Sequence, residues 1–291
     1  MSVADVGLQL ALGLSFGLLL FLLASGFTLT FGLARFVNLA HGAVFLVSGY
    51  VATSLAGPGW RFLTAVLAAG LTGLVLSLGV YGLARLRWRQ VGANELTQVL
   101  LTFGALLLFS DAARSYWGGV PRSFPEPEIL SGSWSIGGVS FPVYRAFMAA
   151  AALVLGAALW WLQERTRFGA FVRAGVDDRE MLEASGISPR PLFLAVFALS
   201  GLLAGLAAGI GAPVIGVAMG QEFSVLVFAF VVVVLGGPGS LTGAFVASLV
   251  VGIADAFGKA LLPTFAEFTM MALVVVVLAW RPAGLFGRVA R

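Results

Sequence analysis

Long stretches without a charged residue constrain the fold of this chain more than any other feature. A bilayer core about 30 Å thick is crossed by roughly 20 apolar residues in helical form, and most of the stretches reach that length. They predict an all-α fold class: a polytopic transmembrane helical bundle of about eight or nine spans, some of them broken helices, in a single domain over residues 1–291. The stretches are Val6–Ala34, Phe36–Trp60, Phe62–Ala84, Leu96–Ser110, Ala146–Gln163, Pro191–Gln221, Phe223–Ala254 and Phe268–Trp280.

The scarcity of charge excludes most soluble classes of protein. Charged residues make up 10% of the chain, whereas about 25% is usual for a soluble domain, whose surface must be hydrated. A soluble enzyme, a disordered chain and a nucleic-acid-binding protein are therefore excluded, and membrane lipid is an expected partner. A membrane-spanning barrel is excluded as well, because the stretches lack the alternation of apolar and polar residues that its strands require.

The chain offers little for catalysis. It has no cysteine and a single histidine, His41, so thiolate chemistry and Cys-based metal sites are excluded, and we expect no enzyme, no cofactor and no metal. Gly13-Leu-Ser15-Phe-Gly17 matches a nucleophile-elbow pattern, but it lies inside the first apolar stretch, and we interpret its two glycines as a helix-packing face. The run from Gly252 to Ala260 resembles a phosphate loop with one residue too many and no hydroxyl for magnesium, so we expect no ATP there.

The distribution of basic residues predicts the orientation. Of the 17 basic residues, twelve fall on the side that holds the loops after Ala84 and Gln163 and the C-terminus, and that side is therefore assigned to the cytoplasm. The N-terminus has Asp5 and no cation before Arg35, so we expect it to face outward. The five basic residues assigned to the outside are Arg61, Arg114, Arg122, Arg145 and Lys259.

Two connections are long enough to carry a function. Residues 116–144 are rich in Pro, Gly and Ser and are expected to form an extracytoplasmic loop. Residues 164–190 fall on the inside and are the most polar part of the chain, with five arginines and five acidic residues. Their polar residues alternate with apolar ones such as Phe171 and Met181, which predicts a short surface helix or helix pair that ends at Gly186.

Polar residues also interrupt the apolar sequence at two places. Between the first two stretches, the segment with Arg35, Asn38, His41 and Gly42 forms either a short cytoplasmic turn with solvated side chains or a broken helix whose freed backbone groups face protein or a watery cavity. In the second half, no helix continues through Gly236-Gly237-Pro238-Gly239-Ser240, so a break is predicted there. Paired interruptions are typical of transporters around a midplane pathway. The pathway candidates are Asn38, His41, Gly42, Gly236, Gly237, Gly239 and Ser240.

Charged residues near the ends of the stretches add one further candidate. An isolated charge near the membrane centre costs about 2.5–3.5 kcal/mol on insertion scales, so such residues pair or line a cavity. Asp255 is the most deeply placed by sequence count and is our candidate for a functional charge, whereas Asp111 and Arg114 can satisfy each other on one helix. Gly201, Gly205 and Gly209 form a stripe of small residues on one predicted helix. The stripe predicts close packing against another helix, and the alternative is that it lines a narrow path.

Three segments, taken in order, resemble one known family. They are the run Gly26–Gly32 with Asn38-Leu-Ala-His41-Gly42 and Gly49-Tyr50, the inner segment from Arg165 to Ile187, and the break at 236–240 followed by Gly252-Ile-Ala-Asp255. Together they resemble the N-terminal signature, the cytoplasmic coupling segment and the C-terminal signature of the branched-chain amino-acid ABC transporter permeases of LivH type. The likeness covers roughly residues 7–286.

The resemblance implies a type-II-like permease subunit of an ATP-driven importer for branched-chain or related amino acids, in the cell inner membrane. The implied partners are a second permease subunit, two ATP-binding subunits and an extracytoplasmic substrate-binding protein. It also implies that residues 164–190 couple the permease to the ATPase. The residues that match the coupling segment are Gly169, Arg173, Ala174, Glu183, Ala184, Gly186 and Ile187, although Ser185 stands where related importers often have Ala.

Two rival functions stay open at this point. A permease of the same family could carry urea or short-chain amides, and a self-sufficient channel or secondary carrier would need no ATPase. Uphill import needs energy, and the sequence shows neither a nucleotide site nor a chain of buried carboxylates for a proton relay. We therefore expect the energy to come from another subunit.

Overall fold

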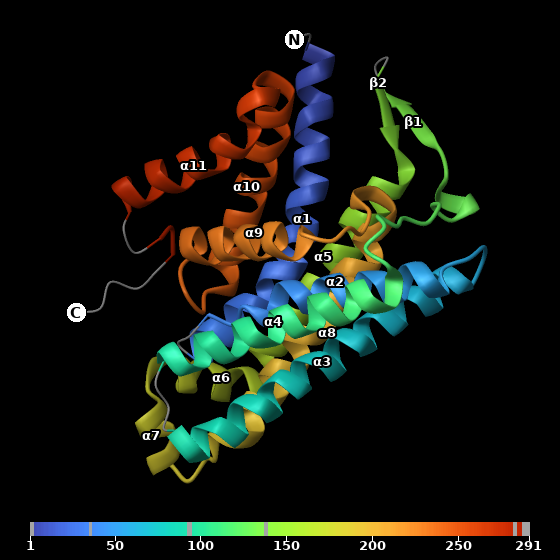
Figure 1. Cartoon of the computed structure of the whole chain (residues 1–291). Coiled ribbons are helices and arrows are strands. Elements are labelled where there is room, and N and C mark those ends of the chain that lie inside the picture. The colour runs from blue at the N-terminus through green and yellow to red at the C-terminus, as the bar shows by residue number, and fades with distance from the viewer. Residues whose placement is uncertain (1–2, 35–36, 92–94, 137–138, 282–283, 287–291) are drawn as a thin grey trace.

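The computed structural model describes residues 3–34, 37–91, 95–136, 139–281 and 284–286. This part of the chain folds into a bundle of helices with one small β-hairpin (Figure 1). The helices are α1 (Val3–Ala34), α2 (Ala40–Leu55), α3 (Arg61–Val91), α4 (Glu95–Trp117), α5 (Val143–Arg165), α6 (Arg167–Asp177), α7 (Arg179–Ala184), α8 (Pro189–Ile215), α9 (Gln221–Gly236), α10 (Leu241–Leu261) and α11 (Ala266–Trp280). The short elements are η1 (Glu128–Leu130), β1 (Ser133–Ile136), β2 (Val139–Pro142) and η2 (Pro263–Phe265).

Six of the described helices are long and apolar enough to cross a membrane, namely α1, α3, α4, α5, α8 and α10. Three shorter apolar helices accompany them, in α2, α9 and residues Met271–Trp280 of α11. The predicted polytopic helical bundle is therefore confirmed. The shorter helices differ from full spans for a local reason: α2 has 16 residues, which at 1.5 Å per residue reach about 24 Å, and Gly57-Pro58-Gly59 ends its apolar stretch.

The longest apolar stretch is divided where the glycines predict a break. Gly237 and Gly239 have φ angles of +96° and +74°, a region that residues with a Cβ rarely adopt. Ser240 then begins α10, since its side-chain oxygen accepts a hydrogen bond from the Gly243 N–H at 3.0 Å. The stretch consequently folds as α9, a tight turn and α10.

Helix α1 lies at the centre of the bundle and packs along α10, α8 and α5. Gly13 and Gly17 face α10 so closely that a Cβ on either would overlap the backbone around Ile253 or Ser248. The opposing Gly252 is equally restricted by Gly13 and Gly17. The pattern around Ser15 is thus a helix-packing face, as interpreted from the sequence.

The second close crossing joins α3 to α8. A Cβ on Gly201 would overlap the carbonyl oxygen of Gly73, and one on Gly205 would overlap that of Ala69. Gly209 meets Val66 one turn further along. The glycine stripe of α8 is therefore a packing surface against α3.

The two ends of the bundle differ (Figure 1). The start of α1 and the β1–β2 hairpin lie at one end, which we call the outer end, and α6 and α7 lie at the opposite, inner end.

The hairpin, with Trp134 opposite Phe141, was not predicted within residues 116–144, because Pro and Gly dominate that segment. At the inner end, the Leu285 N–H donates to the Leu235 carbonyl, so the described C-terminal residues pack on the end of α9.

Candidate functional site

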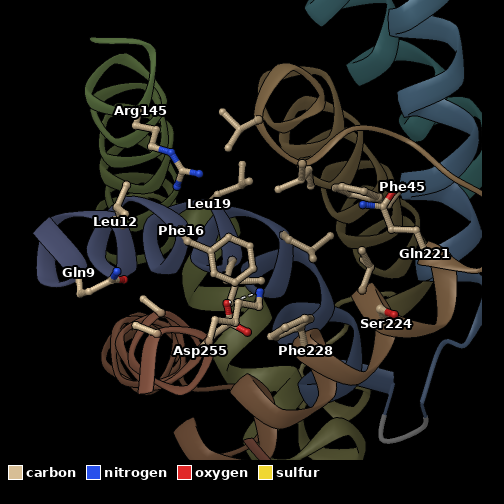
Figure 2. A pocket seen from close by; sticks show the side chains of 18 residues that line it. Gln9, Leu12, Phe16, Leu19, Phe45, Arg145, Gln221, Ser224, Phe228 and Asp255 are labelled. Carbon is tan, nitrogen blue, oxygen red and sulfur yellow. Dashed lines mark hydrogen bonds and ion pairs between the residues drawn. The ribbon is translucent and has the colours of Figure 1, made fainter. Parts of the chain in front are cut away.

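A cavity of about 580 Å³ lies among the outer halves of α1, α5, α8, α9 and α10 (Figure 2). We call it the outer cavity. Much of its surface is apolar and is supplied by leucines of α1 and by three aromatic rings, those of Phe16, Phe45 and Phe228. The rings of Phe16 and Phe228 meet edge to face with centroids 5.6 Å apart. Such a surface suits an apolar side chain of a ligand.

An acidic and a basic residue from α10 stand at one side of the outer cavity. Lys259 Nζ lies 2.6 Å from Asp255 Oδ2 and 5.6 Å from the centroid of the Phe16 ring. The Asp255 side chain is 11% exposed and the Lys259 side chain 62%. The carboxylate is therefore part of the wall, whereas the ammonium is accessible at the edge.

A further basic group enters the outer cavity from α5. Figure 2 shows the Arg145 guanidinium pointing inward from the side opposite Asp255. Among the described residues it makes no hydrogen bond or ion pair, and it interacts with Glu126 only electrostatically. The site thus combines an apolar surface with charges of both signs.

His41 lies behind the inner wall of the outer cavity. Its Nε2 is 3.1 Å from the carbonyl oxygen of Leu23, a cavity-lining residue, and its Nδ1 is 3.4 Å from Ser200 Oγ. A carbonyl can only accept, so Nε2 carries the proton and the Ser200 hydroxyl donates to Nδ1. The ring is 1% exposed and ties α2 to both α1 and α8.

Asn38 and Gly42 flank this histidine in a buried setting. Asn38 is 2% exposed, and the N–H of the next residue, Leu39, donates to Thr102 Oγ1 of α4 at 3.2 Å. A Cβ on Gly42 would overlap the backbone of Glu222 at the start of α9. The prediction of a solvated turn is therefore wrong for Asn38, His41 and Gly42, which are buried within the protein. Arg35, which belongs to the same predicted segment, lies outside the described residues.

The turn at 236–240 lies at the inner end, and none of its residues lines the outer cavity. The Cα of Gly239 packs against Gly32 near the end of α1, and Val176 of α6 lies beside both glycines. Gly236 faces Gly243 across the turn. The turn is thus a contact among α1, α6 and α10, which we call the inner joint.

Residues 164–190 fold into α6 and α7, and we call them the inner hairpin. Thr166 Oγ1 accepts from the Gly169 N–H at 3.3 Å, and Asp178 Oδ1 accepts from the Met181 N–H at 3.0 Å, so each helix has an N-cap. Gly169 packs on the backbone of Gln163, which leaves no room for a side chain. The predicted helix pair is therefore present.

Two contacts fix the ends of the inner hairpin. Arg173 Nη1 donates to the carbonyl of Gln163 and lies 3.6 Å from Glu164 Oε2. At the other end, Gly186 adopts a φ of +79° and its N–H donates to the Glu183 carbonyl at 3.0 Å. The hairpin consequently leaves and rejoins the bundle at defined positions.

The inner hairpin has a buried and an exposed face. Val172, Gly175 and Leu182 are buried toward the bundle, and Gly175 packs against Leu33 of α1. Met181 is 64% exposed and Phe171 is also exposed. The coupling candidates divide in the same way: Gly169 is buried and Ile187 half-buried, whereas the exposed ones are Arg173, Ala174, Glu183, Ala184 and Gly186.

Comparison with known proteins identifies the family of this chain. Residues 9–280 match the family described as the permease component of the branched-chain amino acid transport system. The chain belongs to this family. The high-affinity branched-chain amino acid transport system permease proteins BraD of Pseudomonas aeruginosa and LivH of Escherichia coli are each 27% identical to it, over 96% of this chain and 95% of the relative. The ribose import permease protein RbsC of Escherichia coli is 28% identical over 88% of this chain and 79% of its own. No solved structure matches the chain.

In this permease, the predicted pathway residues lie at three levels of the bundle. Asp255 lines the outer cavity, Asn38, His41 and Gly42 lie in the core, and the 236–240 turn forms the inner joint. Asp111 and Arg114 of α4 are both exposed and form no ion pair with each other. The structure therefore does not bring the predicted residues together in one site.

Several cavity residues of the permease were not predicted from the sequence. Arg145 and Lys259 were predicted only as cations on the outer side, and the aromatic pair Phe16 and Phe228 was not predicted. A weak signal existed for Lys259, which stands four residues after Asp255 and so shares its helix face. For Arg145 there was none, because its approach to Asp255 depends on the packing of α5 beside α1.

Proposed function

We propose that this permease is the membrane-spanning subunit of an ATP-driven importer for branched-chain or related amino acids. The observation that carries the proposal is that one helix, α1, lines the outer cavity at one end and contacts the inner hairpin at the other. Family membership supports transport as the activity. The amino-acid substrate is supported by the names of BraD and LivH.

The contacts at the inner end explain how a partner could act on the path. Leu33 of α1 packs against Gly175 of α6, and Gly32 packs against Gly239 of the inner joint. A displacement of the inner hairpin therefore moves α1, whose other half carries Phe16 and Leu23 into the outer cavity. Alternating access then follows from a shift of packed helices.

The exposed face of the inner hairpin is the proposed docking surface for an ATP-binding subunit. Phe171 and Met181 are exposed there beside charged residues, the combination of apolar centre and polar rim that interfaces use. We propose two such subunits, one for this permease and one for a second permease subunit that completes the path. An extracytoplasmic substrate-binding protein would deliver amino acids to the outer end.

The proposed orientation follows from these partners. The inner end faces the cytoplasm, where ATP is available, and the chain lies in the cell inner membrane with its N-terminus outside and its C-terminus inside. The positive-inside rule favours the same assignment, because Arg165, Arg167 and Arg173 belong to the inner hairpin.

Reconstitution into proteoliposomes tests the proposal. The permease with its partner subunits should take up labelled leucine only when ATP is supplied. Uptake by the isolated chain without ATP would instead indicate a channel or secondary carrier. Uptake of labelled urea in place of leucine would indicate the amide permease.

A substitution at Met181 tests the docking surface. Met181→Glu places a charge in the centre of the proposed contact, and we expect roughly a tenfold loss of ATP-driven uptake, which corresponds to about 1.4 kcal/mol of binding. Met181→Leu keeps volume and polarity and should behave as wild type. Co-purification of the ATP-binding subunit separates lost docking from lost folding.

A further inference from the structure

The outer cavity holds more charge than an apolar conduit requires. Asp255 belongs to its wall and Arg145 points into it from the opposite side (Figure 2). Removing charged groups from water is costly unless a partner compensates them. Two opposed charges around an apolar surface therefore indicate a ligand that carries both signs and an apolar part.

Arg145 has unused capacity to bind an anion. Its guanidinium carries five N–H donors, and none of them donates to a described residue. Glu126 is too far for an ion pair and only contributes to the local field. A planar guanidinium pairs well with a carboxylate through two parallel hydrogen bonds.

Lys259 marks the position at which a ligand ammonium would bind. Its Nζ lies 2.6 Å from the Asp255 carboxylate and above the Phe16 ring, an arrangement of anion and aromatic face that suits any primary ammonium. The Lys259 side chain is 62% exposed. Ion pairs with an exposed partner are weak, so another ammonium can replace Lys259 on Asp255 at little cost.

We propose that the outer cavity binds the zwitterionic head of an amino acid. The α-carboxylate pairs with Arg145, and the α-ammonium replaces Lys259 on Asp255. The apolar side chain of the ligand lies against Phe16 and Phe228. This inference rests on the proposed function and adds to it the residues that recognise the substrate.

The proposed site also separates amino acids from the other solutes considered. Urea and ribose carry no opposed charges, so they leave Arg145 unpaired and cannot replace the Lys259 ammonium. A ribose import permease protein is also similar to this chain, so sequence similarity alone does not set the substrate. In this proposal, the charges of the outer cavity distinguish amino acids from urea and ribose.

Photo-crosslinking of the assembled transporter tests the inference. The complex in lipid nanodiscs, without ATP, is illuminated with a leucine analogue that carries a diazirine in its side chain, and the labelled peptides are identified by mass spectrometry. We expect labels on the segments of α1 and α9 that contain Phe16 and Phe228. Leucine should compete, whereas 3-methylbutylamine, 4-methylpentanoate and urea should compete poorly, because each lacks one or both charged ends.

Variants of the three charged residues should change the labelling in opposite directions. Asp255→Asn and Arg145→Gln should each lower labelling about 10- to 100-fold, as expected for the loss of a hydrogen bond to a charged group. Lys259→Gln should raise labelling severalfold, because it frees Asp255 for the ligand. The matched controls Asp111→Asn and Arg114→Gln change exposed residues of α4 outside the outer cavity and should label as wild type.

Failure of this inference can be distinguished from failure of the proposed transport function. If Lys259→Gln lowers labelling as Asp255→Asn does, the pair merely stabilises the end of α10 and the inference is wrong. Absence of cavity labelling in the wild type, or labelling unaffected by Arg145→Gln, also overturns it. ATP-driven leucine uptake by the same wild-type complex, measured in parallel, reports on the proposed function alone.

Discussion

Gly73 of α3 and Gly201 of α8 pack backbone to backbone, and a Cβ on either residue would overlap the carbonyl oxygen of the other. The contact brings the two helices to the close approach that small residues allow in membranes. Ser77 reinforces it one turn away, where its hydroxyl donates to the Phe197 carbonyl at 2.7 Å. The crossing of α3 and α8 is therefore closely packed and leaves no room for a side chain at either glycine.

Gly201→Ala should destabilise the protein by about 1–3 kcal/mol, because the added methyl forces the helices apart. Gly79→Ala is the matched control, since a Cβ there meets nothing within 4 Å. It should stabilise α3 by about 0.5–1 kcal/mol. Thermal unfolding of both variants in detergent measures the difference; equal midpoints would show that the crossing tolerates a wider separation.

Ser200→Ala should cost about 0.5–1.5 kcal/mol, the usual net contribution of one hydrogen bond, because His41 Nδ1 loses its donor. His41→Ala should cost more, since it also removes the contact with Leu23 and a buried ring. Thermal unfolding ranks the two variants. The reverse order would mean that the histidine does not hold α2 against its neighbours.

Gly186→Trp should uncouple ATP hydrolysis from leucine uptake. The residue has a φ of +79° and lies exposed at the end of α7, so Trp strains the turn and adds a large ring to the proposed docking surface. Gly186→Asn is the control, because Asn tolerates this conformation better than other side chains. Uptake and ATP hydrolysis are measured together in proteoliposomes, and unchanged uptake by the Trp variant would contradict the coupling role.

Gly32→Ala should lower ATP-driven uptake several-fold without preventing assembly, because a Cβ there overlaps Gly239 and displaces the inner joint. Gly7→Ala changes the same helix at its exposed outer end, where nothing lies within 4 Å, and should transport as wild type. Labelled leucine uptake compares them at equal amounts of reconstituted complex. Equal uptake would show that the inner joint plays no part in coupling.

The sequence alone predicted the elements whose signals are local. Charge-free stretches gave the helices, and the glycines and proline at 236–240 gave the break, because φ preference is a property of each residue. Helix partners were not predictable in the same way. Gly201 indicates a close neighbour but not that the neighbour is α3, since any helix with small residues satisfies that requirement.

The candidate site was predicted only in part for a related reason. Asp255 stood out as a charge in an apolar stretch, whereas Arg145 looked like one cation among several near a membrane surface. Its relation to Asp255 spans 110 residues of chain and exists only once α5, α1 and α10 have packed. Recognition by side chains from distant segments leaves no pattern in a single sequence.

Helix α1 is continuous over 32 residues and contains no proline, which at 1.5 Å per residue gives a rod of about 48 Å. A continuous helix of this kind has no hinge, so its two halves are expected to move together. A tilt of its inner end is expected to move the outer end in the opposite direction about the close crossing with α10. A single proline introduced midway along α1 should therefore uncouple movements of the inner end from those of the outer cavity.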